Sequence, residues 1–214
     1  MAHLNAGAVE LGRSGVRFAW AAAEAPAERE SLSGDRHLVK ETEHGVLVAV
    51  LDALGHGVDA SHVADLALND LHRQETEALD QLLLRWHQEL RGSRGVVASL
   101  AWFDRFGAVS WLAVGNVSTT LWRSSYGTMR VHASARIHPG IIGAQIPQLR
   151  IEIRALQPND LLILATDGIG VDMVTGFTAS DSPETIALKF LAEGKNPSDD
   201  GLVLVGRPEW RHDA

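Results

Sequence analysis

The stretch "GVLVAVLDALGHGVDA", residues 45–60, joins an apolar run, a carboxylate and a glycine-rich turn. Its first part, 46–51, is a continuous series of aliphatic and β-branched residues, which predicts a strand buried on both faces. The run ends at Asp52, and the glycines that follow predict a sharp turn, because glycine adopts positive φ at little cost. A carboxylate at the end of a rigid strand, next to such a turn, suits a plain turn, a metal ion or the phosphate of a nucleotide.

The sequence around this stretch predicts a fold with more strands than helices. Apolar residues at helical spacing predict helices at 60–74, 77–90 and 182–194. Strands are predicted at 16–26, 46–51, 95–105, 108–125, 127–134, 148–156, 161–166 and 201–207. This order lacks the regular strand–helix alternation of a parallel sheet, so it predicts an α+β fold with antiparallel sheets and helices packed outside. No linker or repeat interrupts the pattern, and we expect one domain over residues 1–214.

The composition is that of an acidic globular protein. The chain has 214 residues, a formal net charge of −8 and no cysteine. The lack of cysteine excludes disulfides, thiolate metal sites and cysteine nucleophiles, and the negative charge disfavours a nucleic-acid partner. No apolar run approaches the roughly 18–20 residues that span a bilayer, and the N-terminal residues lack the pattern of a signal peptide. We therefore expect a cytoplasmic protein with no membrane partner.

Acidic residues stand at the ends of the buried runs. Asp52 and Asp167 each follow such a run, Asp199 and Asp200 precede the last one, and Asp35 lies in a polar stretch with turn signals. If these runs are adjacent antiparallel strands, the ends of two meet the start of the third and the acids converge. Converging carboxylates repel one another, and hard divalent cations compensate that repulsion. Two such ions, roughly 3.5–4 Å apart, activate water for in-line attack on phosphorus, which predicts a metal-dependent phosphate hydrolase.

Other interpretations use the same residues. Taken singly, an Asp-Gly pair is most often an ordinary turn, and His56 is most often a structural or surface histidine. The segment 55–60 fits the pattern G-x-G-x-x-A of a dinucleotide-binding turn, but the later sequence lacks βαβ alternation and an acid for the ribose. Zinc chemistry is disfavoured because the 10 histidines are scattered and no H-E-x-x-H motif occurs.

Several segments together carry a resemblance to a known family. They are "GDRHLV", "GVLVAVLDALGHG", "VGNVSTTLW", "GIIGAQIPQLRIEIRALQPNDLLILATDGI" and "DDGLVLVGR". From about residue 16 to residue 207 the chain resembles the bacterial PP2C-like serine/threonine phosphatases of the SpoIIE type, and most of all the short stand-alone form that serves the stressosome. The resemblance implies an αββα sandwich of two antiparallel sheets flanked by helices, with a pair of Mn²⁺ or Mg²⁺ ions at one end.

The resemblance also implies a role for each acid. Asp52 matches the aspartate that bridges the two ions, and Ala53, which stands where the family usually has glycine, offers its main-chain carbonyl as a ligand. The other matched metal ligands are Asp35, Asp167 and Asp199, with Asp200 as the alternative to Asp199. Asp52 and Asp167 are thereby implied as the residues on which catalysis depends.

The implied activity is hydrolysis of phosphoserine or phosphothreonine on a partner protein by metal-activated water, with no side chain as nucleophile. His56 is a candidate proton donor to the leaving serine oxygen, and Leu202 departs from the threonine or serine that the family has after the acidic pair. The implied partners are the phosphorylated STAS-domain scaffold proteins of the stressosome, RsbS and RsbR. The alternatives are an inert binding module with the same fold, disfavoured because every aspartate needed is present, and a nucleotide-binding protein that uses the 55–60 turn.

Overall fold

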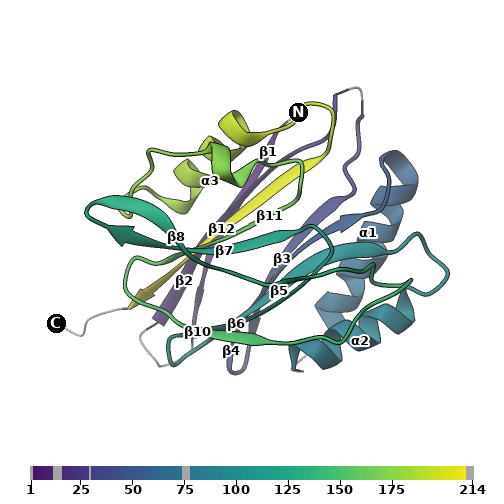
Figure 1. The fold of residues 1–214 in the computed structure, drawn as a ribbon, viewed down its shortest axis with the longest axis horizontal. Helices are drawn as coiled ribbons and strands as arrows, with labels where there is room; N and C mark the ends of the chain where they lie inside the picture. Colours follow the sequence, from purple (N-terminus) through teal and green to yellow (C-terminus); the bar gives the residue numbers. More distant parts are fainter. Residues whose placement is uncertain (1, 12–15, 29, 74–77, 211–214) are drawn as a thin grey trace.

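The computed structural model describes residues 2–11, 16–28, 30–73 and 78–210, and Figure 1 shows two sheets stacked face to face with helices outside them. The first sheet has the strand order β1-β2-β12-β11-β7-β8 and the second β10-β6-β5-β4-β3, with β9 beside β6. The strands of the first sheet are β1 (His3–Glu10), β2 (Val16–Ala25), β7 (Ser118–Ser125), β8 (Thr128–Ser134), β11 (Leu161–Ala165) and β12 (Gly201–Trp210). Those of the second are β3 (Asp35–Thr42), β4 (Gly45–Ala53), β5 (Val96–Asp104), β6 (Ala108–Val114), β9 (Ile137–His138) and β10 (Glu152–Ala155).

Three helices cover the outer faces of the sandwich. Helices α1 (Gly57–Arg73) and α2 (Leu79–Glu89) pack on the second sheet, and α3 (Pro183–Gly194) packs on the first. A short 3₁₀ helix, η1 (Val171–Met173), precedes α3. The side chain of Ser182 accepts a hydrogen bond from the main-chain nitrogen of Thr185 and so caps α3, as its sequence predicts. None of the described helices is both long and apolar enough to cross a membrane.

The core between the sheets confirms the expected αββα sandwich and the α+β class. Large side chains from both sheets, among them Phe18, Trp111 and Leu162, are buried in this inner layer. Two further buried clusters join each sheet to its own helices. The continuous apolar runs predicted from the sequence are therefore strands with a sheet on one side and a helix on the other, which explains why both of their faces are apolar.

Strand β4 shows how the sequence sets the direction of each side chain. Those facing the other sheet are Val46, Val48 and Val50, and those facing the helices are Leu47, Ala49 and Leu51. Because successive side chains of a strand point to opposite faces, Asp52 continues the first series and points between the sheets. Asp35 pairs directly with Asp52 across β3 and β4, so it lies on the same face. The alternating side-chain directions along β4, together with its pairing to β3, thus aim two carboxylates at the space between the sheets.

Some of the predicted elements are wrong. The segment 108–125 is not one strand, because the chain leaves the second sheet after β6 and enters the first as β7. The predicted strand 148–156 is shortened to β10, and β1, β3 and the two-residue strand β9 were not predicted at all. Strands β1 and β3 each lie at a sheet edge, and β1 is largely exposed, so neither needs a continuous apolar pattern. Helix α1 begins at Gly57 rather than residue 60, and residues 74 and 77 of the predicted helices lie outside the described residues.

The predicted route to convergence of the acids also needs correction. Strands β11 and β12 are indeed antiparallel neighbours, but β4 belongs to the opposite sheet. Asp35 is the first residue of β3 and not part of a turn. The acids therefore approach one another across the interior of the sandwich, which places them at one end of the inner core.

Candidate functional site

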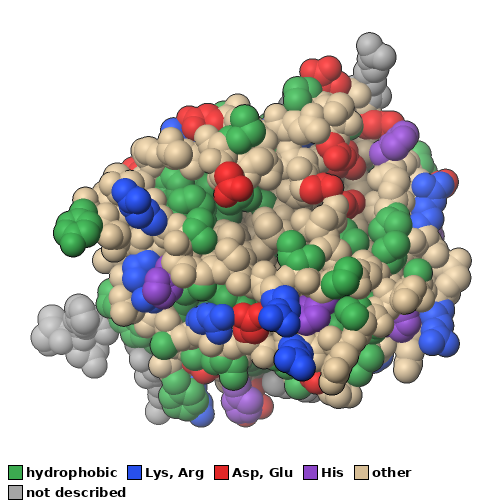
Figure 2. Space-filling model, viewed as in Figure 1, with side chains coloured by type: hydrophobic (Ala, Val, Ile, Leu, Met, Phe, Trp, Pro, Cys, Tyr) green, Lys and Arg blue, Asp and Glu red, His purple; other side chains and the backbone are tan. Residues whose placement is uncertain are grey.

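A cleft of about 840 Å³ opens between the two sheets at the ends of β4 and β11. In Figure 2 acidic side chains gather over the upper part of this face of the molecule. The residues that line the cleft are Ala27, Glu28, Glu30, Asp52, Leu54, Gly55, His56, Val97, Gly115, Asn116, Ile137, Pro139, Ile141, Asp167, Ser198 and Asp199. Three of the predicted site residues, Asp52, Asp167 and Asp199, therefore meet in one cleft, and none of its described lining residues is a lysine or an arginine.

Asp52 and Asp35 form the buried side of the site. Burial, together with the nearby charges of Asp167, Asp199 and Asp200, raises the pKa of Asp52 from 3.8 to about 7. Asp35 is 1% exposed, and its carboxylate accepts a hydrogen bond of 2.8 Å from the hydroxyl of Thr166. Burial, and after it the charge of Asp52, raises the pKa of Asp35 well above 3.8. Both carboxylates are thus placed where a negative charge is costly unless a cation accompanies it.

Asp167 follows β11 and is exposed to the cleft. The side-chain nitrogen of Asn116 donates a hydrogen bond of 2.5 Å to its Oδ2. Burial, followed by the charge of Asp199, raises the pKa of Asp167, although the bond from Asn116 acts in the opposite direction. Gly168 is required beside it, because a Cβ at this position would lie 1.7 Å from the main-chain oxygen of Asp200.

The structure separates the two acids of the terminal pair. Asp200 is 6% exposed, and its two carboxylate oxygens accept hydrogen bonds from the main-chain nitrogens of Ala27, at 2.9 Å, and Gly34, at 2.7 Å. Asp199 is exposed and lines the cleft, and among the described residues its carboxylate accepts a hydrogen bond only from the main-chain nitrogen of Asp200, at 2.9 Å. Asp200 therefore ties the loop before β3 to the start of β12, whereas Asp199 keeps a carboxylate oxygen for the cleft.

Ala53 is fully buried at the end of β4 and does not line the cleft. Its carbonyl oxygen lies beside Gly34, where a Cβ would approach it to 3.2 Å. Ala53 is not among the residues with positive φ, so alanine occupies this position without strain. The change from the glycine usual in the family therefore leaves the main-chain carbonyl in place.

The glycine turn 54–57 holds His56 at the rim of the cleft. Gly55 and Gly57 both have positive φ, as the sequence predicts. The Nδ1 atom of His56 lies 2.9 Å from Oε1 of Glu30, which lines the same cleft. Strand β4, which precedes the turn, pairs antiparallel with both of its neighbours, so the turn does not open the βαβ unit that dinucleotide binding needs.

Sequence reasoning missed three residues of the site. Asn116 lies in the crossing from β6 to β7, which was predicted as the interior of a strand. Glu30 belongs to no motif, and Thr166 lies in the 166–169 motif without any sign of its role; their partners are 26 and 131 residues away in the chain. The "GN" pair at 115–116 was the available signal, because a glycine and an asparagine inside an apolar strand indicate a break.

The acids of the cleft, Asp52, Asp167 and Asp199, line its wall and do not converge on one compact coordination site. Among the described residues no three histidine or acidic side chains are grouped closely enough to form a coordination shell by themselves. Lys195 is the nearby cation, and its ammonium group donates to the main-chain oxygens of Asn196 and Asp199 rather than to a carboxylate of the cleft. The chain thus gathers acids from both sheets, and none of its described lysines or arginines forms an ion pair with Asp52, Asp167 or Asp199.

Comparisons with known proteins agree with this geometry. A family model described as "Stage II sporulation protein E (SpoIIE)" matches residues 42–206. A solved structure described as "The bacterial stressosome: a modular system that has been adapted to control secondary messenger signaling" is 29% identical, with a TM-score of 0.73 over 96% of this chain and 100% of that one. A search of curated protein sequences found no relative.

Two further solved structures have the same fold. RsbX in complex with magnesium is 19% identical, with a TM-score of 0.77 over 96% of this chain and 100% of its own. The PP2C phosphatase domain of SpoIIE from Bacillus subtilis, solved with a fragment of its regulatory domain, is 16% identical, with a TM-score of 0.72 over 99% of this chain and 64% of its own. The family match and these folds confirm the resemblance that the motifs indicated.

Proposed function

This chain belongs to the SpoIIE family of PP2C-like serine/threonine phosphatases, and from that premise we propose that it removes phosphate from a partner protein with the help of two divalent ions. The observation that carries the proposal is the meeting of Asp52, Asp167 and Asp199, from both sheets, around one cleft whose described lining has no cation. Hard divalent cations prefer oxygen ligands and stabilise the ionised form of such carboxylates.

The positions of the acids support a proposed set of metal ligands. Asp52 would contact both ions, and Asp167 and Asp199 would each complete the shell of one of them. Asp35 would act from behind Asp52, directly or through water, and the carbonyl of Ala53 would add a main-chain oxygen. Mg²⁺ usually keeps several of its waters and binds one or two carboxylates, so acids spread around a hollow suit it better than a compact triad would.

The ions, when bound, would supply an activated water and charge compensation for the phosphate. The remaining tasks fall to the residues of the chain. Asn116 holds the carboxylate of Asp167 in one orientation. His56, held through Nδ1 by Glu30, would give a proton to the leaving serine oxygen. The apolar wall of the cleft, which comprises Leu54, Val97, Ile137, Pro139 and Ile141, would receive the part of the partner that surrounds the phosphorylated residue.

The proposed substrates are phosphorylated STAS-domain scaffold proteins of the stressosome, of the RsbS and RsbR type, in the cytoplasm. Two comparisons support this choice. The stressosome-related structure is 29% identical over nearly the whole of both chains, and the RsbX structure aligns over the full length of its own chain. The magnesium in that RsbX structure supports the choice of Mg²⁺, or Mn²⁺ with its similar oxygen preference, as the ion.

The test is phosphate release from a phosphoserine-bearing STAS-domain protein with Mn²⁺, with Mg²⁺ and with a chelator. The parent chain should release phosphate only with metal, and Asp167→Asn should lose at least about a hundredfold in rate, because a metal ligand is removed. Asp172→Asn is the matched control, since Asp172 is exposed and lies outside the cleft. Metal-independent release, or equal rates for the parent and Asp167→Asn, would overturn the proposed site.

A further inference from the structure

The charges of this chain are strongly segregated along the sequence. Residues 105–159 contain six arginines and a single acid, Glu152, for a net charge of +5. The whole chain has a net charge of −8, so the remaining residues together carry −13. A separation of this size between two parts of one small fold creates a positive and a negative surface, which direct the approach and orientation of charged partners.

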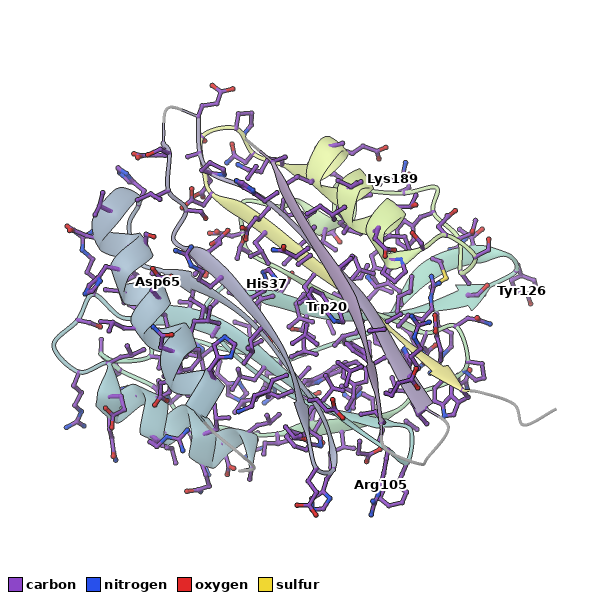
Figure 3. All side chains as sticks on the ribbon, turned by 180° about the vertical axis from the view of Figure 1, so that it is seen from behind. Trp20, His37, Asp65, Arg105, Tyr126 and Lys189 are labelled. Atoms are coloured by element: carbon purple, nitrogen blue, oxygen red, sulfur yellow. The ribbon has the colours of Figure 1, made fainter. Side chains whose placement is uncertain are left out.

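The structure collects most of this positive charge on one face. We call it the arginine face and define it by Arg123, Arg130, His132, Arg136, Arg150 and Arg154. Strands β8 and β10, which carry three of these residues, are the edge strands of the two sheets on the same side of the sandwich (Figure 1). Figure 2 shows blue side chains along the lower part of this side, below the acidic cleft. The opposite edges, β1 and β3, are seen from behind in Figure 3.

Contacts between the sheets join the arginine face into one surface. The guanidinium of Arg123, on β7, lies 3.0 Å from the ring of His132 on β8 and 3.4 Å from the main-chain oxygen of Ala155 on β10. Arg154 stacks over the ring of Trp111, with its guanidinium carbon 5.5 Å from the ring centre, and pairs with Glu152. The two sheet edges therefore present their charges side by side rather than on separate surfaces.

Three arginines of this face have no partner in the described part of the chain. Arg130, Arg136 and Arg150 are exposed, and their side chains make no hydrogen bond or ion pair there. Several other exposed and half-buried arginines are paired with acids, as in the bonds from Arg36 to Asp65 and from Arg94 to Asp59. Unpaired guanidinium groups on one side of an acidic protein are available for carboxylates or phosphates from outside.

The arginine face continues into the catalytic cleft. Arg136 is followed in the chain by Ile137, which lines the cleft, and the loop that begins with the cleft residues Pro139 and Ile141 runs on to Arg150. Exposed apolar side chains lie between the charges: Val131 is 44% exposed, Ile137 48% and Ile153 64%. Arginine mixed with exposed aliphatic groups is typical of a protein-binding surface.

We propose that the arginine face docks an acidic surface of the phosphorylated partner protein and so presents its phosphoserine to the cleft. This inference rests on the proposed phosphatase function and adds the chemistry by which the substrate is selected. The acidic cleft repels an acidic protein that approaches directly, whereas the neighbouring arginines attract it and fix its orientation. Charged surfaces of this kind act mainly on association and on selectivity, and they leave the chemical step unchanged.

The experiment uses two synthetic phosphoserine peptides, one flanked by glutamates and one by glutamines at the same positions. The parent chain with Mg²⁺ or Mn²⁺ should have a higher kcat/KM on the glutamate peptide at low salt. The triple variant Arg130→Gln, Arg136→Gln, Arg150→Gln should lose this preference, at about two- to fivefold per arginine, as expected for exposed charge pairs. Its kcat/KM on p-nitrophenyl phosphate, which is too small to reach the face, should equal that of the parent.

The matched control is Arg91→Gln, another exposed arginine that lies outside residues 105–159. It should keep the preference of the parent for the glutamate peptide. An unchanged preference in the triple variant, or an equal loss in Arg91→Gln, would overturn the proposal. So would a triple variant that keeps the peptide preference but loses binding to phosphatidylserine vesicles or to an RNA oligonucleotide, because the face would then serve a membrane or a nucleic acid.

A binding measurement separates failure of this inference from failure of the proposed function. Fluorescence anisotropy with the labelled glutamate peptide, synthesised without phosphate, reports docking whether or not the chain is an active enzyme. Tighter binding to the parent than to the triple variant would support the face even if no phosphate were released. Equal binding, together with normal hydrolysis of p-nitrophenyl phosphate, would reject the face and leave the catalytic site intact.

Discussion

Strand β11 has an aspartate at each end, and the two differ in burial and in their partners. Asp160, before the strand, is 0% exposed and accepts hydrogen bonds of 2.8 and 2.7 Å from Arg123 and one of 2.8 Å from the main-chain nitrogen of Gln157. Asp167, after the strand, is exposed, has a raised pKa and accepts a side-chain bond only from Asn116. The same residue type therefore serves the fold at one end of the strand and the cleft at the other.

The two aspartates differ in the source of the charge that compensates them. A buried carboxylate with a guanidinium and a main-chain donor has its charge balanced within the chain, so it stabilises the fold that brings those groups together. A carboxylate that faces other carboxylates without a cation destabilises the fold until something binds. Such a group is retained for a ligand, which is why perturbed pKa values gather at functional sites.

The largest effect that we expect from this comparison is on stability. Asp160→Asn should lower the free energy of unfolding by about 3 kcal/mol, because it leaves Arg123 without its anionic partner. Asp167→Asn should change it by less than about 0.5 kcal/mol in chelator, because it removes repulsion and no ion pair. Urea unfolding of both variants measures the difference, and losses of equal size would contradict the distinction between the two ends of β11.

The second prediction concerns pH. The pKa of Asp52 is raised from 3.8 to about 7, so between these values the folded chain keeps a proton that the unfolded chain releases. Asp52 therefore contributes a loss of stability as pH rises through this window. His37, whose pKa burial lowers from 6.5 to about 4, contributes a gain with rising pH, so the parent must be compared with Asp52→Asn at each pH.

In chelator, the stability of Asp52→Asn relative to the parent should increase from pH 5 to pH 8. Saturating Mg²⁺ should reverse this trend, because metal binds the ionised carboxylate and stabilises only the folded chain that holds it. Urea unfolding at each pH, with chelator and with Mg²⁺, checks both statements. A parent that gains stability over Asp52→Asn with rising pH in chelator would show that the carboxylate is not buried among like charges.

The smallest effect is expected at Asn116. Asn116→Ala should lower the rate of phosphate release about tenfold and weaken metal binding by a similar factor, because Asp167 loses the donor that orients it. Asn116→Asp should be worse than alanine, since it adds a further negative charge to the cleft. Metal titrations and rates on the same preparations would check this order, and variants that match the parent in both would remove Asn116 from the site.

The sequence by itself determined much of this protein. The continuous apolar run 46–51 predicts a buried strand that ends at Asp52, and the glycines after it set the turn. The order of runs and turns determines the α+β class, because strand and helix periodicities are local properties of the chain. The motifs at 52–57, 166–169 and 199–200 indicate the family, because the residues of each motif are close together in the sequence.

The tertiary structure decided which groups meet. Whether β4 pairs with β11 or faces it across the core depends on contacts between distant segments, and no local pattern reports them. Asp200 is held by hydrogen bonds from the main-chain nitrogens of Ala27 and Gly34, which lie more than 160 residues away, and only Asp199 is left facing the cleft. The arginine face likewise exists only because the edges of two sheets lie on one side of the sandwich. Charge and burial act through space, so the sequence supplies the groups and the fold determines their neighbours.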